Sequence, residues 1–208
     1  SPGRIVFVDQ TNGSDGNTGS AGLPFRTIAK AESVLPTAGG TIDIVDPGTY
    51  NEQVTLSVPT NLLASGGAVD ITQVTLATRS VSATSVQAAS VLVKLGAKVQ
   101  AGVDLAASAG TVTLANGTFT ETVTIGKDLT LQAQNEAQAS IKPASGPSVQ
   151  LTGGSVTVTG LNLTGAKGVL IAGGSGHKLQ RNNLAGNSSG IGVDNQTASQ
   201  VDAASSWW

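Results

Sequence analysis

Short bursts of alternating apolar and polar residues recur through most of this chain. Val112 and Leu114 alternate with Thr111 and Thr113, and the same period of two returns in the segments 54–56, 123–125, 156–158 and 161–163. Successive side chains of a strand point to opposite faces, so the pattern predicts strands with an aliphatic inner face and a threonine-rich outer face.

One strand, turn and strand unit occurs twice. Residues 41–56 (TIDIVDPGTYNEQVTL) are echoed by residues 111–125 (TVTLANGTFTETVTI), and both copies share a glycine, a threonine, an aromatic residue and a glutamate at the turn. A unit this small does not bury its own apolar face, which predicts stacked coils of a solenoid. We assign a structural role to the shared turn positions, which are Gly48, Tyr50 and Glu52 in the first copy and Gly117, Phe119 and Glu121 in the second.

A shorter repeat of 21 to 22 residues appears in the last third of the chain. Residues 160–165 match 181–186, and residues 168–171 match 190–193. Three strands of about four to five residues, joined by turns, use this length, and such coils stack about 4.8 Å apart. The repeat predicts that Asn162 and Asn183 lie in register and hydrogen-bond along the stack as part of the scaffold.

The first 40 residues read as a strand at 4–8, a polar loop at 9–19 and a short helix at 27–35 that ends before Pro36. We expect this helix to cover the N-terminal end of the stack, because an uncovered strand edge invites pairing with other chains. Later in the chain, residues 91–93 read as a strand, and Val99, Val103 and Ala106 permit a second helix.

Length and repeat together predict one domain over residues 1–208. It comprises an N-terminal part (1–40) and stacked coils (41–208), with a second cap-like repeat at about 97–133. The chain starts without methionine and stops at two tryptophans, so we expect an excised part of a longer protein. We expect Trp207 and Trp208 to fold over the last coil as a partial plug, and self-association at this truncated edge if they do not.

Composition narrows the function classes. Charged residues make up 12% of the chain and the formal net charge is −2, which argues against nucleic acid as a partner. No run approaches the roughly 20 apolar residues that cross a bilayer, and there is no cysteine for disulfides or thiolate metal sites.

Candidate catalytic groups are sparse, and we predict no catalytic residue. Asp43 and Asp46 lie three residues apart at a strand end, and the sequence Asp46-Pro47-Gly48 fits turn chemistry. Glu52 and Glu121 follow the same turn on different coils, so hydrogen bonding to the turn or backbone explains them better than a carboxylate pair. His177, the single histidine, lies in a glycine-rich stretch without a nearby carboxylate, which predicts a surface loop.

Calcium is the one cofactor that the sequence suggests. Asp9, Asn12, Asp15 and Asn17 offer hard oxygen ligands at close spacing in the polar loop. The spacing departs from an EF-hand, and polar residues in tight loops commonly bond their own backbone. We therefore keep both hypotheses, a calcium site and a self-bonded loop.

Three segments carry a family resemblance. Residues 7–19 and 24–28, together with the Gly-Thr-Tyr-Asn-Glu turn at 48–52, resemble the N-terminal cap and first coil of the pectate-lyase-like right-handed parallel β-helix superfamily. Residues 201–208 resemble a segment near the end of many bacterial surface β-helices, whereas residues 60–95 match poorly. The resemblance implies an all-β, right-handed, single-stranded parallel β-helix with a short N-terminal capping helix.

The superfamily contains polysaccharide lyases, galacturonases, phage tailspikes and bacterial adhesins, so the resemblance alone does not select an activity. We expect a non-catalytic rod of adhesin or surface-layer type, extracellular or at the cell surface, with a carbohydrate or protein partner. One alternative is a fragment of a polysaccharide lyase or glycosidase acting on acidic polysaccharide. A second is an ice-binding solenoid with outward threonine rows.

Overall fold

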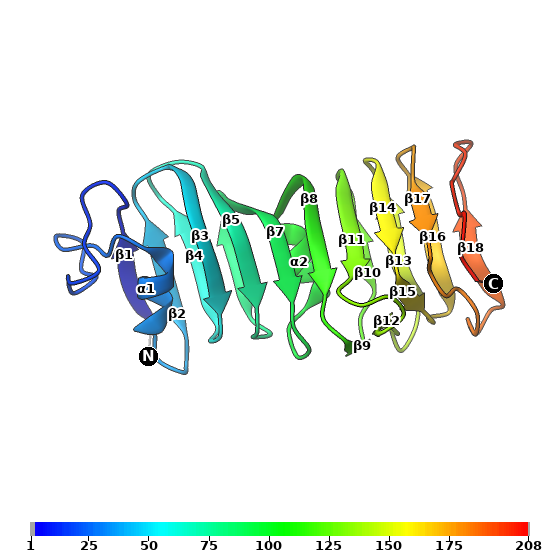
Figure 1. Ribbon diagram of the computed structural model, residues 1–208, viewed down its shortest axis with the longest axis horizontal. Helices are drawn as coiled ribbons and strands as arrows, with labels where there is room; N and C mark the ends of the chain where they lie inside the picture. The colour runs from blue at the N-terminus through cyan, green and yellow to red at the C-terminus, as the bar shows by residue number, and fades with distance from the viewer. Residues whose placement is uncertain (1–2, 208) are drawn as a thin grey trace.

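The chain folds as an elongated β-solenoid of about 7 turns. A computed structural model describes residues 3–207, and Figure 1 shows the N-terminus at one end of the rod and the C-terminus towards the other. All pairings between its named strands are parallel. Only 6% of the residues are helical, so the predicted all-β parallel β-helix is confirmed.

The largest sheet runs along most of the rod. Its seven strands are β3 (Gly48–Leu56), β5 (Val69–Leu76), β7 (Val86–Val93), β8 (Ala106–Leu114), β11 (Leu129–Ala133), β14 (Val156–Thr159) and β17 (Lys178–Gln180). One buried side chain from each strand stacks on the next, in the order Val54, Val74, Val91, Val112, Leu131, Val158 and Leu179. This inward row confirms the alternation that the sequence predicted.

Three smaller sheets complete the walls. The first contains β1 (Arg4–Val8), β2 (Gly40–Ile44), β4 (Thr60–Ala64) and β6 (Val81–Thr84). The second contains β9 (Gly117–Phe119), β12 (Ala139–Ile141) and β15 (Leu161–Leu163). The third contains β10 (Val123–Ile125), β13 (Pro147–Thr152), β16 (Lys167–Gly173) and β18 (Ile191–Asn195). Their buried residues join one core that extends from Val6 to Leu184.

Helix α1 (Ile28–Ser33) packs against β1, β2 and β3 at the N-terminal end, as the sequence predicted. The Thr27 side chain caps it by accepting a hydrogen bond from the Lys30 N–H (3.1 Å). The outer edge of β1 is covered as well, because the Phe7 N–H donates to the Gly19 carbonyl and the Phe25 N–H donates to the Phe7 carbonyl (both 2.9 Å). This end of the rod therefore offers little free strand edge.

Helix α2 (Val99–Leu105) confirms the second predicted helix, but it lies within the rod, beside β7 and β8 (Figure 1). The chain enters β4 from β3, β6 from β5 and β9 from β8, whereas it enters α2 from β7. Helix α2 thus replaces a strand in its coil. Gly102 permits the close approach of α2 to β7, because a Cβ at this position would lie 2.6 Å from the Cγ2 atom of Val93.

The two copies of the long repeat occupy different walls. The first copy begins in β2, in the sheet ordered β1-β2-β4-β6. The second copy begins in β8, in the seven-stranded sheet. As a result Val112 stacks in the same row as Val54, although the sequence repeat aligns Val112 with Ile42. In both places the repeated sequence forms strands on either side of a corner, but the second copy starts one wall further around the coil than the first.

The C-terminal end departs from the prediction of an aromatic plug. Trp207 continues the stack through its backbone, since its N–H donates to the Asn182 carbonyl (2.9 Å) and its carbonyl accepts from the Leu184 N–H (2.8 Å). Its side chain is 55% exposed, so the expected burial of this ring is wrong. Trp208 lies outside the described residues.

Candidate functional site

The two repeated glutamates hold the start of the two helices. Glu52 accepts hydrogen bonds from the N–H groups of Ile28 (3.1 Å) and Ala29 (3.0 Å), at the N-terminus of α1. Glu121 accepts from Val99 (2.9 Å) and Gln100 (3.3 Å), at the N-terminus of α2. Each carboxylate therefore satisfies two backbone donors and complements the positive end of a helix. Backbone bonding, as predicted, explains both residues.

The rest of the repeated turn is equally structural. Gly48 and Gly117 have φ angles of 129° and 130°, in a region that side chains rarely adopt. Tyr50 and Phe119 both point into the core. The Tyr50 hydroxyl donates to the Asp46 carbonyl (3.0 Å), and burial raises the pKa of this phenol. The shared residues form a corner, and the glutamate of each corner accepts hydrogen bonds from the N-terminus of a helix.

Replacing Glu121 with Gln tests this assignment. The amide keeps one acceptor oxygen but loses the charge and the second acceptor, so we expect the free energy of unfolding to fall by about 1 to 2 kcal/mol. Chemical denaturation monitored by circular dichroism measures the loss. Glu136→Gln is the matched control, because Glu136 lies on the surface in a long ion pair with Arg181 (3.9 Å). Equal losses for the two variants would contradict the capping role.

The polar loop uses its own oxygens. Asp9 Oδ1 accepts from the N–H groups of Thr11 (3.0 Å) and Asn12 (2.7 Å), and the Asn12 amide donates to Asp9 Oδ2 (3.1 Å). These bonds lower the pKa of Asp9. Asn17 Nδ2 donates to the Pro24 carbonyl (2.9 Å).

Asp15 ties the same loop to α1. Its Oδ1 accepts from the N–H groups of Arg26 (3.0 Å) and Thr27 (2.9 Å), and its Oδ2 accepts from the Thr27 hydroxyl (2.9 Å). The self-bonded loop is therefore present, and the calcium site stays a prediction. In the described residues, no group of three or more His, Cys, Asp or Glu side chains is placed to hold a metal ion.

The remaining titratable candidates also face structural partners. Asp46 Oδ2 accepts from the N–H (3.1 Å) and hydroxyl (2.8 Å) of Thr11, which joins the turn to the polar loop. Asp43 Oδ1 accepts from the Ser65 hydroxyl of the next coil. The Asp46 contacts agree with its expected turn role, whereas Asp43 lies within β2 and links two coils.

His177 is buried, so its predicted place on a surface loop is wrong. The side chain is 1% exposed, its Nδ1 accepts from the Val156 N–H (3.2 Å), and its Nε2 lies 2.9 Å from the Gly173 carbonyl. The two contacts assign the proton to Nε2. The sequence did not indicate this burial because both partners of the ring are backbone groups.

Asn162 and Asn183 lie in register as predicted, but their side chains bond elsewhere. Asn162 Nδ2 donates to the Ala137 carbonyl (2.9 Å), and Asn183 Oδ1 accepts from the Ala185 N–H (3.1 Å). The predicted bonding along the stack is therefore found for Asn162, whose Nδ2 also donates to Ser140 Oγ (3.3 Å) of the preceding coil, and is wrong for Asn183, which bonds within its own turn. The neighbouring Asn182, which sequence analysis missed, is the fully buried asparagine that links two coils.

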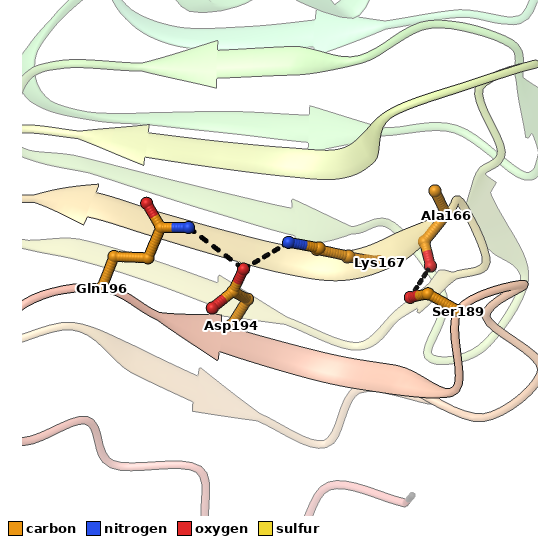
Figure 2. A network of polar contacts seen from close by, with 5 residues as sticks. All are labelled: Ala166, Lys167, Ser189, Asp194 and Gln196. Atoms are coloured by element: carbon orange, nitrogen blue, oxygen red, sulfur yellow. Dashed lines mark hydrogen bonds and ion pairs between the residues drawn. The ribbon is translucent and has the colours of Figure 1, made fainter.

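An ion pair lies on the outer side of the last two coils. Figure 2 shows Lys167 of β16 reaching Asp194 of β18, which also accepts from Gln196 Nε2 (3.2 Å). The bond from Lys167 is the main reason why the pKa of Asp194 lies below its ordinary value of 3.8. Near it, the Ser189 hydroxyl donates to the Ala166 carbonyl of the preceding coil (Figure 2).

The ion pair predicts a stability change in acid. Because the pKa of Asp194 is lower in the folded state, its contribution is present above about pH 4 and is lost as the pH falls through the folded-state value. Asp194→Asn should therefore melt below the parent protein at pH 7, and the two melting temperatures should converge towards pH 3. Thermal scans at both pH values measure this, and a difference that is the same at both would contradict the assignment.

The insertion of α2 leaves two hollows, which we together call the α2 groove. One, of about 220 Å3, lies between β6 and α2 and is lined by Val81, Ser82, Ala83, Ala101, Asp104 and Leu105. The other, of about 320 Å3, is lined by Ala68, Val69, Ser85, Val86, Gln87, Asp104, Ala106 and Lys127. Because Asp104 borders both hollows, the α2 groove is the candidate functional site.

Asp104 and Lys127 are the charged residues that line the α2 groove. Lys127 Nζ donates to the carbonyls of Asp104 (3.4 Å) and Ala106, at the C-terminal end of α2. Burial lowers the pKa of Lys127, and the Asp104 charge opposes this effect. Gln100 Nε2 donates to Asp104 Oδ1 (2.8 Å), and Oδ2 has no hydrogen-bond partner among the described residues.

Comparison with known proteins gives one family match. The sequence model of the family described as "Protein of unknown function (DUF1565)" matches residues 11–62, well under half of the chain. This segment runs from the polar loop through α1 to β4, and so overlaps the cap and first coil that carry the resemblance above. Neither the curated proteins nor the solved structures contain a match. None of the helices described here is long and apolar enough to span a membrane.

Proposed function

We propose that this chain is a non-catalytic structural module, a rigid β-helix rod from a secreted or cell-surface protein of adhesin or surface-layer type. The single observation that supports it most is that its candidate polar side chains form hydrogen bonds to the protein's own backbone. Glu52, Glu121, Asp15 and His177 all bond backbone groups that hold coils, corners or helices together. These groups stabilise the rod.

The proposal includes a place in the pectate-lyase-like superfamily and an extracellular partner, carbohydrate or protein, that contacts the sides of the rod. The continuous core and the parallel stacking of the strands favour a rigid rod, as this role requires. The low charge favours partners other than nucleic acid.

Incubation with pectate and alginate, with and without calcium, tests the non-catalytic role. We expect no unsaturated oligosaccharides by ultraviolet absorbance or chromatography, with a known lyase as the positive control. Unsaturated products that depend on this protein would overturn the proposal in favour of the polysaccharide lyase alternative. Heat-unfolded protein in the same buffers controls for contaminating activity.

One surface supports the ice-binding alternative. Two outward rows follow the seven-stranded sheet; their members are Gln53, Gln73, Ser90, Thr111, Thr130, Thr157 and Lys178 in one row, and Thr55, Thr75, Leu92, Thr113, Gln132, Thr159 and Gln180 in the other. Glutamine and leucine interrupt the threonines, so we rank this alternative below the rod. Thermal hysteresis during ice growth, lost in Thr113→Lys, would reverse that ranking.

A further inference from the structure

One strand edge in the middle of the rod has no neighbouring strand. β6 is the last strand of the sheet ordered β1-β2-β4-β6, and the coil that follows supplies α2 in place of another strand. The residues 82–85 at this edge are exposed and carry no charge or proline. Natural proteins commonly protect a free edge with charged residues or proline, or cover it with a helix. Helix α2 lies beside β6 but, in the part of the chain that the structure describes, makes no backbone hydrogen bond to it, so this edge keeps groups that are open to pairing.

The bonding phase of β6 shows which of its backbone groups are free. The Thr60 N–H donates to the Ser80 carbonyl (2.9 Å), and Thr60 is the register partner of Val81. In a parallel pair, alternate residues direct both backbone groups towards the neighbour. Ser80 and Ser82 therefore face β4, whereas Val81 and Ala83 direct their N–H and C=O groups away from it.

The same reasoning applies to the first residue of β7. The Val69 N–H donates to the Ser85 carbonyl (3.0 Å), so Val86 directs its backbone groups away from β5. Two residues later, Ala88 pairs with Ala106 of β8. The free edge of β6 therefore comprises Val81 and Ala83. Val86 lies beyond a corner, since the chain turns at Ser85 (φ 59°) into the seven-stranded sheet, and Val86 is only 7% exposed.

Val81 and Ala83 border the α2 groove, which gives the free edge room. Val81 and Ala83 line the hollow of about 220 Å3, and Val86 lines the hollow of about 320 Å3. Among the described residues, no hydrogen bond joins their outward groups to α2 or to another segment. Asp104 borders both hollows and is the one charged residue that lines the hollow beside Val81 and Ala83, whereas Lys127 lines the other hollow.

We propose that the α2 groove binds an extended peptide segment of a partner protein, which pairs with Val81 and Ala83 and places a Lys or Arg side chain at Asp104. The proposal rests on the proposed role as a rod that contacts partners through its sides. Strand addition suits an edge with alternating free N–H and C=O groups, and the pockets beside it select the side chains. The carboxylate favours a basic residue in the peptide.

Amide hydrogen exchange on the free protein tests the edge itself. We expect the amides of Val81 and Ala83 to exchange rapidly, while the Ser82 amide, which bonds to β4, is protected. Protection of Val81 and Ala83 in the free protein would show an edge that is already paired, and would overturn the proposal.

A synthetic peptide tests the binding. The probe is acetyl-Thr-Val-Lys-Val-Thr-Val-amide, titrated into the 15N-labelled protein. We expect shifts and slower exchange at Val81 and Ala83. A version with alternate N-methylated amides should not bind, because it lacks the donors for the edge.

Three variants sharpen the test. Ala83→Pro removes an N–H that β4 does not use, so it should fold normally and weaken peptide binding by at least about tenfold. Thr84→Pro is the control for the direction of the N–H group. It removes an N–H that points to β4, so it should lower the melting temperature instead. Asp104→Asn should weaken the lysine peptide and leave its glutamine counterpart unaffected.

No change on addition of the peptide, or equal binding by Ala83→Pro, would overturn the proposal. Shifts at these amides with cellohexaose and none with the peptide would overturn it in favour of a glycan site. Cleavage of pectate or alginate would instead contradict the proposed rod and would leave the peptide result as measured, so the two failures are distinguishable.

Discussion

An aspartate in place of Val112 is expected to lower the free energy of unfolding by about 3 to 5 kcal/mol. Val112 is fully buried and stacks between Val91 and Leu131 in the inward row of the seven-stranded sheet. A carboxylate there has neither water nor a cation as partner. Urea denaturation followed by circular dichroism measures the loss, and so does the melting temperature if the variant still folds.

Thr113→Asp is the matched control, one residue along the same strand. Thr113 points outward, where its hydroxyl accepts from Gln132 Nε2 (3.1 Å), so an aspartate there should cost under about 1 kcal/mol. Ile125 and Thr124 of β10 form a second pair, one buried and one exposed. Similar losses within either pair would contradict the register of these strands.

Replacing Asn182 with Ala is the second large effect that we expect, at about 2 to 4 kcal/mol. The side chain is fully buried, its Oδ1 accepts from the Leu161 N–H (3.0 Å), and its Nδ2 donates to the Val158 carbonyl (2.8 Å). Truncation leaves two backbone groups of the preceding coil without their partner in the core. Chemical denaturation gives the magnitude.

Asn183→Ala is the control, and it separates the two adjacent asparagines. Asn183 bonds the nearby Ala185 N–H in an exposed turn, where water replaces the lost partner, so we expect a loss below about 1 kcal/mol. A larger loss at Asn183 than at Asn182 would mean that the sequence repeat, and not the buried contact, identifies the structural residue.

The walls of the rod could be predicted from the sequence because local alternation and global packing agree. Val112 and Ile125 face inward and Thr113 and Thr124 face outward, as the period of two requires. The helical spacing of apolar residues after Thr27 and the stop before Pro36 likewise indicated α1. The bonding of Glu52 and Glu121 was expected only in kind, because their partners lie over 20 residues earlier.

Other features depend on contacts between coils. The burial of His177 was missed because one of its partners, the Val156 N–H, lies on a neighbouring coil, which a single segment does not reveal. The Asn183 side chain instead bonds Ala185 two residues along, within its own turn, so its place in the repeat gave no guide to its partner. The turn at Gly117 reads the same as the turn at Gly48, yet the two lie at different corners of the rod.

The sequence by itself determined the strand pattern, the coil length and the position of the helices, since each follows from the spacing of apolar side chains over a few residues. Only the tertiary structure decided that α2 replaces a strand inside the rod and frees the edge of β6. The physical reason is that an edge is free only relative to the coil stacked on it. That neighbour is set by how the coils register, about 20 residues apart in the chain.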